Sequence, residues 1–370
     1  MGKCLVCGEK AETISDHLGV CLKCIRGKPE KALEITRQVH TKSRGVFGLP
    51  PEPPKDADGL PCRVCANDCV IGVDNCGFCG LVWNVGGRLV RFGGTAEKGV
   101  LEWYYDSLPT NCVSWWFCPG CTGSGYPKYA YKQGAEYGYA NLAVFYGACS
   151  FDCLFCQNWH YRNLSVKHKP VMSAHDLADK VDQHVSCICY FGGDPSPQMP
   201  HSLDVSRIAY EKAKAEERIL RICWETNGYM NPKLAKKAAE YALESGGNIK
   251  FDLKAWSEEL TVALCGVSNK PTLENFKMIG EKFYPKRREL PMLTASTLLV
   301  PGYIDMEEVE NIAKFISEID PNIPYTLLAF YPCYVMNDLP TTSRKQALEC
   351  QKAAEKHLKN TRIGNVNLLT

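Results

Sequence analysis

The chain has 370 residues, of which 45% are hydrophobic and 23% are charged, and its formal net charge is +2. High apolar content and a small net charge exclude intrinsic disorder. The same balance gives no indication of bulk electrostatic binding to nucleic acid or to an anionic membrane. The unusual feature of the composition is its 21 cysteines.

The first residues, MGKCLVCGEK, lack the apolar segment of a signal peptide, and no run of 18 apolar residues predicts a membrane-spanning helix. We therefore expect a cytoplasmic protein without a membrane or nucleic-acid partner. Disulfides do not persist in that reducing compartment. The cysteines are accordingly expected to be metal or cluster ligands, together with some plain core thiols.

Residues 1–47 predict a metal-bound knuckle followed by a helix. The pattern CxxC-x13-CxxC brings four thiolates together for zinc, as in a zinc ribbon, or for a single iron, as in rubredoxin. Such a short segment has little core, so the metal is expected to hold its fold. Apolar residues at helical spacing predict a helix within 28–46. The four predicted ligands are Cys4, Cys7, Cys21 and Cys24.

Residues 48–60 are rich in proline and predict either a semi-rigid linker or a loop that wraps the surface. Residues 61–140 follow as a cysteine-rich auxiliary domain. Within it, residues 81–93 predict a hairpin that turns at Gly86 and Gly87. Aromatic residues at several positions of this domain could line a pocket or pack around metal sites.

Eight cysteines of the auxiliary domain are enough for two sites of four thiolates. At least one of these sites is expected to be an additional [4Fe-4S] cluster, and the alternative is a zinc-stabilised domain. The favoured grouping places Cys62, Cys65, Cys69 and Cys79 in one set and Cys76, Cys112, Cys118 and Cys121 in the other.

Residues 141–370 alternate between strand-like and helix-like segments, with about 30 residues per unit. This spacing is typical of βα units and predicts an α/β fold with a parallel sheet, in the form of a partial (β/α)6 barrel. Strands are expected at 141–148, 187–193, 220–228, 247–255, 293–302 and 325–333. Helices are expected at 173–183, 202–218, 232–245, 272–284 and 306–319.

The central motif is Cys149-x3-Cys153-x2-Cys156, in the loop after the first of these strands. Three thiolates at this spacing can bind three irons of a [4Fe-4S] cluster and leave the fourth iron open. The alternative is a zinc site with three cysteines and an unidentified fourth ligand. The motif on the first loop of a βα array resembles the radical S-adenosylmethionine (SAM) superfamily. The resemblance implies that the open iron binds SAM and that reduction yields a 5′-deoxyadenosyl radical.

Later loops extend this resemblance to the glycyl-radical-enzyme activase branch. Residues Gly192, Gly193 and Asp194 end the second strand and look like the family's glycine-rich loop, which contacts the SAM amino group. Two further pairs at strand ends resemble loops that touch the ribose, the carboxylate or the substrate. These pairs are Glu225 with Asn227 and Asp252 with Lys254.

The resemblance implies a protein substrate and an electron donor such as ferredoxin. The favoured hypothesis is a methyltransferase like the archaeal cobalamin-dependent enzyme that C-methylates a glutamine of methyl-coenzyme M reductase in methanogens. That hypothesis requires cobalamin, although no cobalamin signature is present. The alternatives are an activase like the pyruvate formate-lyase activating enzyme and a non-catalytic iron-sulfur electron-transfer protein.

The remaining cysteines fall on predicted strands and helices and are expected to be small core residues. Cys333 is the exception, because it lies in the segment YPCY, where the last predicted strand gives way to a loop. These six residues are Cys187, Cys189, Cys223, Cys265, Cys333 and Cys350.

Overall fold

The computed structural model describes residues 1–110 and 112–370, with a nine-stranded sheet at its centre. The strands follow the order β15-β14-β13-β12-β11-β10-β8-β7-β9. The strands from β8 to β15 are parallel, and β7 and β9 extend the β8 edge by antiparallel pairing. The strands are β7 (Gly99–Ser107), β8 (Ala140–Tyr146), β9 (Val171–Met172), β10 (Val185–Gly192), β11 (Arg221–Thr226), β12 (Ile249–Asp252), β13 (Leu293–Leu299), β14 (Tyr325–Ala329) and β15 (Thr361–Gly364).

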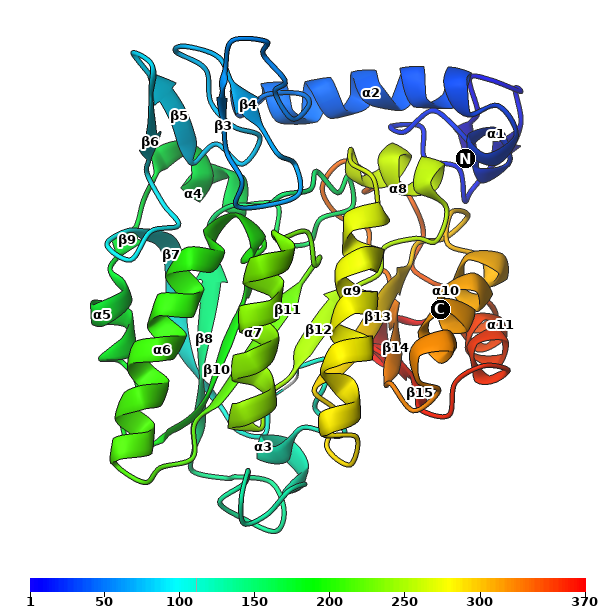
Figure 1. Ribbon diagram of the computed structural model, residues 1–370. Helices are drawn as coiled ribbons and strands as arrows, with labels where there is room; N and C mark the ends of the chain where they lie inside the picture. The colour runs from blue at the N-terminus through cyan, green and yellow to red at the C-terminus, as the bar shows by residue number, and fades with distance from the viewer. Residues whose placement is uncertain (111) are drawn as a thin grey trace.

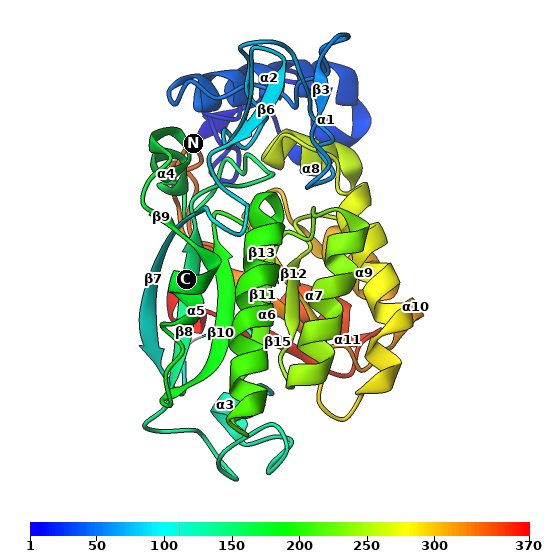
Figure 2. The same cartoon turned by 60° about the vertical axis from the view of Figure 1, so that its left-hand side comes forward.

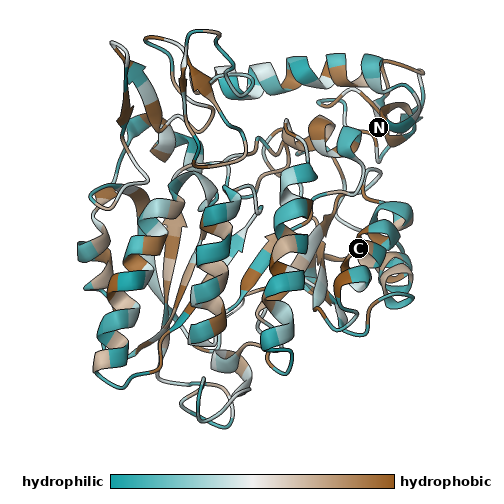
Figure 3. Cartoon of the chain, in the orientation of Figure 1, coloured by the Kyte–Doolittle hydropathy of each residue, from teal (hydrophilic) through white to brown (hydrophobic). Residues whose placement is uncertain are grey.

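Helices cover the outer face of this curved sheet (Figures 1 and 2). The strands are largely apolar, whereas the helices carry hydrophilic residues on the side that faces solvent (Figure 3). The outer helices are α5 (Ala174–Ala178), α6 (Met199–Ala215), α7 (Pro232–Ser245), α9 (Lys270–Lys282), α10 (Met306–Ile319) and α11 (Arg344–Glu355). Two shorter helices, α4 (Tyr161–Lys167) and α8 (Glu258–Cys265), lie at the carboxyl ends of the strands.

Local sequence signals explain where several outer helices begin and end. The side chain of Asn231 accepts a hydrogen bond from the Lys233 amide at the start of α7, and Asp305 does the same for Glu308 at the start of α10. Helix α7 ends at Gly246, which has a φ of 83°. Glycine adopts this left-handed conformation without steric cost, so the chain can turn back towards the sheet.

The α/β fold and the six predicted strands of the partial barrel are confirmed. The sheet remains open, because β9 and β15 are its two edges. The sequence analysis missed the seventh parallel strand, β15, because it is short and contains Arg362 and Gly364. It also missed β7, which lies inside the predicted auxiliary domain. Residues 101–107 of β7 pair with the whole length of β8.

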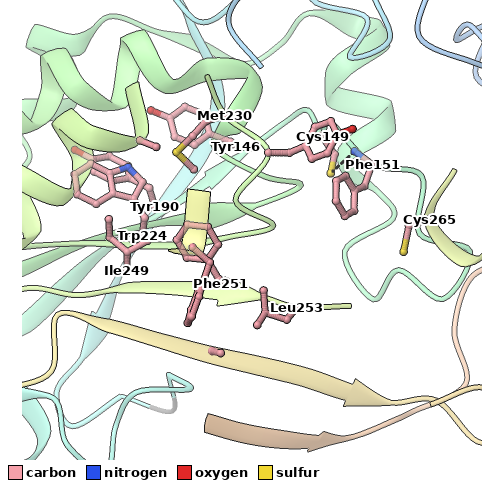
Figure 4. Close-up of a cluster of buried hydrophobic side chains, with 14 of the residues drawn as sticks. Tyr146, Cys149, Phe151, Tyr190, Trp224, Met230, Ile249, Phe251, Leu253 and Cys265 are labelled. Carbon is pink, nitrogen blue, oxygen red and sulfur yellow. Dashed lines mark hydrogen bonds between the residues drawn. The ribbon is translucent and has the colours of Figure 1, made fainter. Parts of the chain in front are cut away.

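The main hydrophobic core lies between the sheet and the outer helices. Figure 4 shows Tyr190, Trp224 and Phe251 in this layer, on three neighbouring strands. The rings of Tyr190 and Trp224 have centroids 5.3 Å apart, and all three side chains are fully buried. Cys149 and Phe151 lie at one end of the same cluster, so the central cysteine motif is anchored in the core.

The N-terminal module docks beside the carboxyl ends of the strands (Figure 1). It consists of β1 (Gly2–Lys3), β2 (Lys10–Ala11), α1 (Leu22–Gly27) and α2 (Pro29–Gly45). The hydroxyl of Tyr303 accepts a hydrogen bond from the Ser15 amide at 3.1 Å and donates one to the Val20 carbonyl at 2.9 Å. Arg26 forms ion pairs with Asp305 at 2.8 Å, where α10 begins. These contacts fix the module on the barrel.

The next module contains two small hairpins on the same end of the barrel (Figure 1). Strand β3 (Leu60–Pro61) pairs with β4 (Val70–Ile71), and β5 (Val82–Val85) pairs with β6 (Arg88–Arg91), which confirms the predicted hairpin. Residues 48–60 pack against this module, since Leu49 is buried and the Asp56 amide donates to the Val70 carbonyl. These contacts favour the surface loop over the semi-rigid linker.

The segment that contains α3 (Pro119–Thr122) lies at the opposite end of the barrel, near the amino ends of the strands (Figures 1 and 2). Between α3 and β8 the chain forms a loop that is fixed by Glu136. This buried carboxylate pairs with Arg221 of β11 at 2.7 Å. Among the described residues, no helix is both long and apolar enough to cross a membrane.

Candidate active site

A cavity of about 320 Å³ lies inside the curve of the sheet and is lined by residues of its strands, of the loops that follow them and of the segment before α3. Such positions are where βα folds place ligands, because the loops after several strands converge there. All the residues predicted for catalysis or cofactor binding line this cavity. They are Cys149, Cys153, Cys156, Gly192, Gly193, Asp194, Glu225, Asn227, Asp252 and Lys254.

The loop after β8 presents three thiols to the cavity. The amide of Phe151 donates to Cys149 Sγ at 3.3 Å, and the side-chain amide of Asn227 lies 3.6 Å from the same sulfur. Burial raises the pKa of the Cys149 thiol well above its usual range and that of Cys156 to about 11. A bound cation would reverse this effect, because metal coordination favours the thiolate. Three thiols on one wall, with open space beside them, fit a [4Fe-4S] cluster that keeps one iron free.

Cys265, at the end of α8, lies directly behind Cys153. The two sulfur atoms are 3.5 Å apart, and Cys265 is completely buried. Hydrogen bonding with Cys265 lowers the pKa of Cys153, because the Cys265 thiol can donate to the Cys153 thiolate. The sequence analysis assigned Cys265 to the core. The structure places it in contact with a predicted cluster ligand, and no spacing pattern links the two residues.

The glycine loop after β10 is packed tightly against the segment before Cys149. The Gly193 amide donates to the Tyr146 carbonyl at 2.9 Å, and the Asp194 amide donates to the Ala148 carbonyl at 2.7 Å. A Cβ atom on Gly193 would lie only 2.3 Å from the Ala148 oxygen. Glycine is therefore required here so that the two loops can approach each other.

The Asp194 carboxylate joins the loops after β10 and β11. It accepts hydrogen bonds from the amides of Ser196 at 2.7 Å and Asn227 at 2.6 Å, and from the Thr226 hydroxyl at 3.1 Å. Burial raises the pKa of Asp194, and these hydrogen bonds oppose that effect. Direct contact between Asp194 and the amino group of SAM stays a prediction.

Asn227 connects this loop junction with the cluster motif. Its side-chain amide donates to the Ser150 hydroxyl at 3.0 Å, and its side-chain carbonyl accepts from the Ser196 hydroxyl at 3.2 Å. The side chain is buried and also reaches Cys149. Asn227 thus holds the cluster loop at a fixed distance from the neighbouring strands.

A chain of alternating charges crosses one wall of the cavity. Lys250 Nζ lies 3.4 Å from Glu225 and 2.6 Å from Asp252, whose second oxygen lies 2.9 Å from Lys254 Nζ. Burial opposes ionisation of Asp252, but the two lysines hold its pKa well below the usual range. The two lysines and the two carboxylates have no net charge together, and they can present both hydrogen-bond donors and acceptors to a zwitterionic ligand. The sequence analysis missed Lys250, although its place two residues before Asp252 on one strand puts both side chains on the same face.

Residues 143–316 match the family model of the radical SAM superfamily. The chain contains a radical SAM domain. One relative from Methanocaldococcus jannaschii is named as a glycyl-radical enzyme activating enzyme and is 28% identical over 215 residues, which are 57% of this chain and 76% of the relative. An uncharacterized protein of the same organism is 25% identical over 331 residues, 84% of this chain and 83% of the relative.

Among solved structures, a domain of the pyruvate-formate lyase-activating enzyme from Bacteroides vulgatus aligns with 48% of this chain and 98% of its own. It has a TM-score of 0.38 and 17% identity. The family match and the relatives confirm the resemblance to the radical SAM superfamily and its activase-like branch.

The radical SAM motif itself is supported by a buried charge cluster. Asp152, between the first two cysteines, pairs with Arg162 at 2.5 Å and with His40 of α2 at 2.8 Å. Arg44 lies 3.8 Å away. Burial would raise the pKa of Asp152, but the His40 hydrogen bond and the two arginines hold it well below the usual range. The N-terminal helix α2 therefore reaches the loop that carries the motif.

The N-terminal cysteines converge on one point. The sulfur atoms of Cys4, Cys7, Cys21 and Cys24 all lie within 4.8 Å of one another, with Cys7 and Cys21 3.8 Å apart. Four sulfurs placed tetrahedrally around zinc at about 2.3 Å are separated by about 3.8 Å. Burial disfavours the Cys4 thiolate, but backbone amides of the knuckle lower its pKa to about 6. The four thiols fit a single zinc or iron ion.

The auxiliary module contains the first of the two predicted sets. The Cys62 amide donates to the Cys69 carbonyl at 2.7 Å, and burial raises the pKa of Cys65 well above its usual range. The Phe78 amide lies 3.5 Å from Cys69 Sγ. These four thiols are further apart than the knuckle ligands, as a cluster with several irons requires. Metal binding by this set stays a prediction.

The second predicted set is not brought together. Cys76 forms a β-bridge with Trp83 in the module at the carboxyl ends of the strands. Cys112, Cys118 and Cys121 belong to the segment around α3, at the opposite end of the barrel (Figure 1). Cys76 cannot share a mononuclear or cubane site with the other three, because the barrel separates them.

Proposed function

We propose that this enzyme removes a hydrogen atom from a polypeptide substrate, as an activase of a glycyl-radical enzyme does. When bound, a [4Fe-4S] cluster supplies the electron that cleaves SAM to the 5′-deoxyadenosyl radical. The observation that carries the proposal is the single cavity on which the three thiols and the predicted SAM-binding residues converge. The name of the relative from Methanocaldococcus jannaschii supports an activase.

The side chains of the cavity suit the parts of SAM. Lys250 and Lys254 can bind a carboxylate, and Glu225 and Asp252 can bind an ammonium or the hydroxyls of a ribose. Trp115, Trp116 and Phe155 also line the cavity and can exclude water from a reactive carbon centre. The cysteine loop is held by Asn227 and Asp152, so its thiols have a fixed orientation.

Cobalamin-dependent methylation of a glutamine in methyl-coenzyme M reductase, expected from the sequence, stays a prediction. Both candidates share the cleavage of SAM, and they differ in the need for cobalamin and in the product. The structure favours neither, because the same cavity residues serve both reactions. We favour the activase because of the relative's name. We also propose that a protein such as ferredoxin donates the electron.

The test is anaerobic reconstitution with iron and sulfide, followed by addition of SAM and a low-potential reductant. We expect 5′-deoxyadenosine from the wild type and at least a hundredfold less from Cys149→Ala. Cys350→Ala, which removes a buried thiol of α11 far from the cavity, is the matched control and should retain the rate. An equal rate in wild type and Cys149→Ala would overturn the proposal.

Cobalamin decides between the two candidates. A cobalamin absorption spectrum in the anaerobically purified protein, with methylated product after addition of SAM, would establish the methyltransferase. Two results together would establish the activase. SAM cleavage would be unaffected by cobalamin, and electron paramagnetic resonance would detect a glycyl radical in a co-expressed partner.

A further inference from the structure

Six cysteines other than the three cluster ligands belong to two neighbouring parts of the barrel, the segment around α3 and the strands β10 and β11. Three come from the segment around α3, two from β10 and one from β11. They are Cys112, Cys118, Cys121, Cys187, Cys189 and Cys223.

The alternation of side chains along a strand shows that the strand thiols face the barrel interior. Tyr190 of β10 and Trp224 of β11 point outward, because they reach Ser206 and Ser202 of α6 at 3.0 and 3.3 Å. Residues at odd positions of these strands must point to the opposite face. Cys187, Cys189 and Cys223 therefore point away from α6, into the barrel. The register places Cys189 beside Cys223 on the neighbouring strand.

Two of the strand thiols are in direct contact, and the backbone brings α3 beside them. The Cys187 and Cys223 sulfur atoms are 3.8 Å apart. Cys118 and Cys121 lie in one turn, because the Cys121 amide donates to the Cys118 carbonyl at 3.1 Å. A Cβ atom on Gly120 of this turn would lie 2.8 Å from Arg221 Nη2, and the strand register pairs Arg221 with Cys187.

The surroundings suit a buried centre made of thiolates. Cys112 lines the cavity together with Glu225, which is two residues after Cys223 on β11 and therefore faces the same side. Arg221 is completely buried beside Cys118 and Cys187, and it is already paired with Glu136. Several buried thiolates need a positive partner, and one divalent cation or an iron-sulfur cluster supplies more charge than this arginine.

The segment around α3 also needs an anchor. It contains the pattern Cys-x5-Cys-x2-Cys, and α3 has only four residues. Its side-chain contacts with the sheet include the Ser114 hydroxyl, which donates to Asn248 just before β12 at 3.1 Å, and the Trp115 ring, whose centroid lies 4.2 Å from the Arg362 guanidinium of β15. A metal that binds both this segment and β10 would hold it in the barrel, as metals do in small folds with little core.

Among the described residues, only the knuckle thiols form a set within 4.8 Å of one another, so the wider spacing of the thiols inside the barrel suits a cluster of several irons and not a single ion. We infer that Cys112, Cys118 and Cys121, together with a thiolate of β10, bind an iron-sulfur cluster inside the barrel. Cys187 and Cys189 are the two candidates for the fourth ligand. Cys112 lines the same cavity as Cys149, so this centre forms part of the cavity floor. A redox-active metal there would face whatever molecule the cavity holds. This inference does not depend on the proposed activase function, because it concerns metal content alone.

The experiment measures iron, zinc and acid-labile sulfide per chain in anaerobically purified full-length variants. The background is Cys149→Ala, which removes the contribution of the SAM cluster site. We expect Cys118→Ala to lose a cluster's iron with a matching amount of sulfide. The double variant Cys187→Ala/Cys189→Ala should lose the same amount, and either single variant identifies the fourth ligand. Cys350→Ala, another buried cysteine, is the matched control and should lose none.

A measurement on the unaltered protein makes the test independent of variant folding. Cys112 and Cys121 are partly exposed, so iodoacetamide can reach them in the folded chain. We expect both to be protected from alkylation in the native holoprotein and to become reactive after treatment with a chelator, as mapped by mass spectrometry. Equal alkylation before and after chelation, or full metal content in Cys118→Ala, would overturn the inference. Loss of protection only at the knuckle cysteines would do the same.

Discussion

Asn67 of the auxiliary module donates a hydrogen bond to the Ser150 carbonyl, 2.8 Å away, in the loop that carries the SAM cluster thiols. The same module forms a β-bridge between Cys65 and Met230 and a hydrogen bond from the Ala66 amide to the Tyr229 carbonyl. Predicted ligands of the auxiliary cluster are thus only a few residues from the active-site loop. A change in one site should be detectable in the other.

Asn67→Ala should weaken this connection. A buried carbonyl without a partner costs about 1–3 kcal/mol, so we expect the free energy of unfolding to fall by that amount. Iron bound at Cys149 should also be lost faster in air. The matched control is Asn337→Ala, since Asn337 donates to the Tyr334 carbonyl at 2.9 Å in an exposed position. Urea unfolding that is equal for the two variants would contradict the prediction.

Cys265→Ala should lower the reduction potential of the SAM cluster. The thiol of Cys265 lies 3.5 Å from Cys153, and hydrogen bonds to cluster sulfur atoms stabilise the more negative, reduced state. Potentiometric titration followed by electron paramagnetic resonance measures the change. Cys265→Ser keeps a donor and should restore the potential, whereas a merely structural role would leave the potential of both variants equal to that of the wild type.

Asp152→Asn should destabilise the fold strongly. The variant leaves Arg162 and His40 without the buried negative charge that pairs with them, and breaking such a pair costs about 3–5 kcal/mol. Glu310→Gln removes an exposed ion pair with Lys356 and serves as the control, with an expected loss of about 0–1 kcal/mol. Denaturant unfolding at neutral pH measures both values, and similar losses would contradict the prediction.

Asp152 also gives stability a pH dependence with a defined sign. Its folded pKa is lowered well below that of the unfolded chain, about 3.9, so the unfolded state binds a proton first as the pH falls. The contribution of Asp152 is complete above about pH 5 and is lost progressively as the pH drops below about 4. The free energy of unfolding of Asp152→Asn should therefore fall less steeply with acid than that of the wild type.

Cys4→Ala should remove one metal ion from the N-terminal knuckle and leave the SAM site loaded. The metal is expected to hold this module, which has a core of only a few residues. Elemental analysis together with limited proteolysis checks both parts, since residues 1–47 should become sensitive to protease. The control is Leu5→Ala, which truncates an exposed neighbour and should change neither result.

Patterns with a fixed spacing could be predicted from the sequence. The three-cysteine motif, the knuckle and the six βα units each depend on residues that are close in the chain, and strand ends in parallel sheets necessarily meet at one edge. This is why Glu225 and Lys254, from different strands, could be assigned to one cavity before their distance was known.

Contacts between distant segments could not be predicted in this way. No local signal indicates that Cys265 of α8 meets Cys153, or that Gly120 of α3 packs against Arg221 of β11. The expectation for Cys76 failed for the same reason, since a cysteine count gives the number of ligands without their position. Strand β7 was missed because its exposed Tyr104 and Tyr105 hide the alternation of a half-buried strand.

The ion pair between Arg26 and Asp305 joins positions that are 279 residues apart in the chain. At about 5–20 residues per second, the ribosome needs between about 15 and 55 s to make the intervening chain. During that time the knuckle has no surface on which to dock, so a metal ion bound by its four thiols would be needed to keep it folded. The availability of zinc or iron at the start of translation should then affect the yield of the complete protein, even though the four thiols lie outside the cavity.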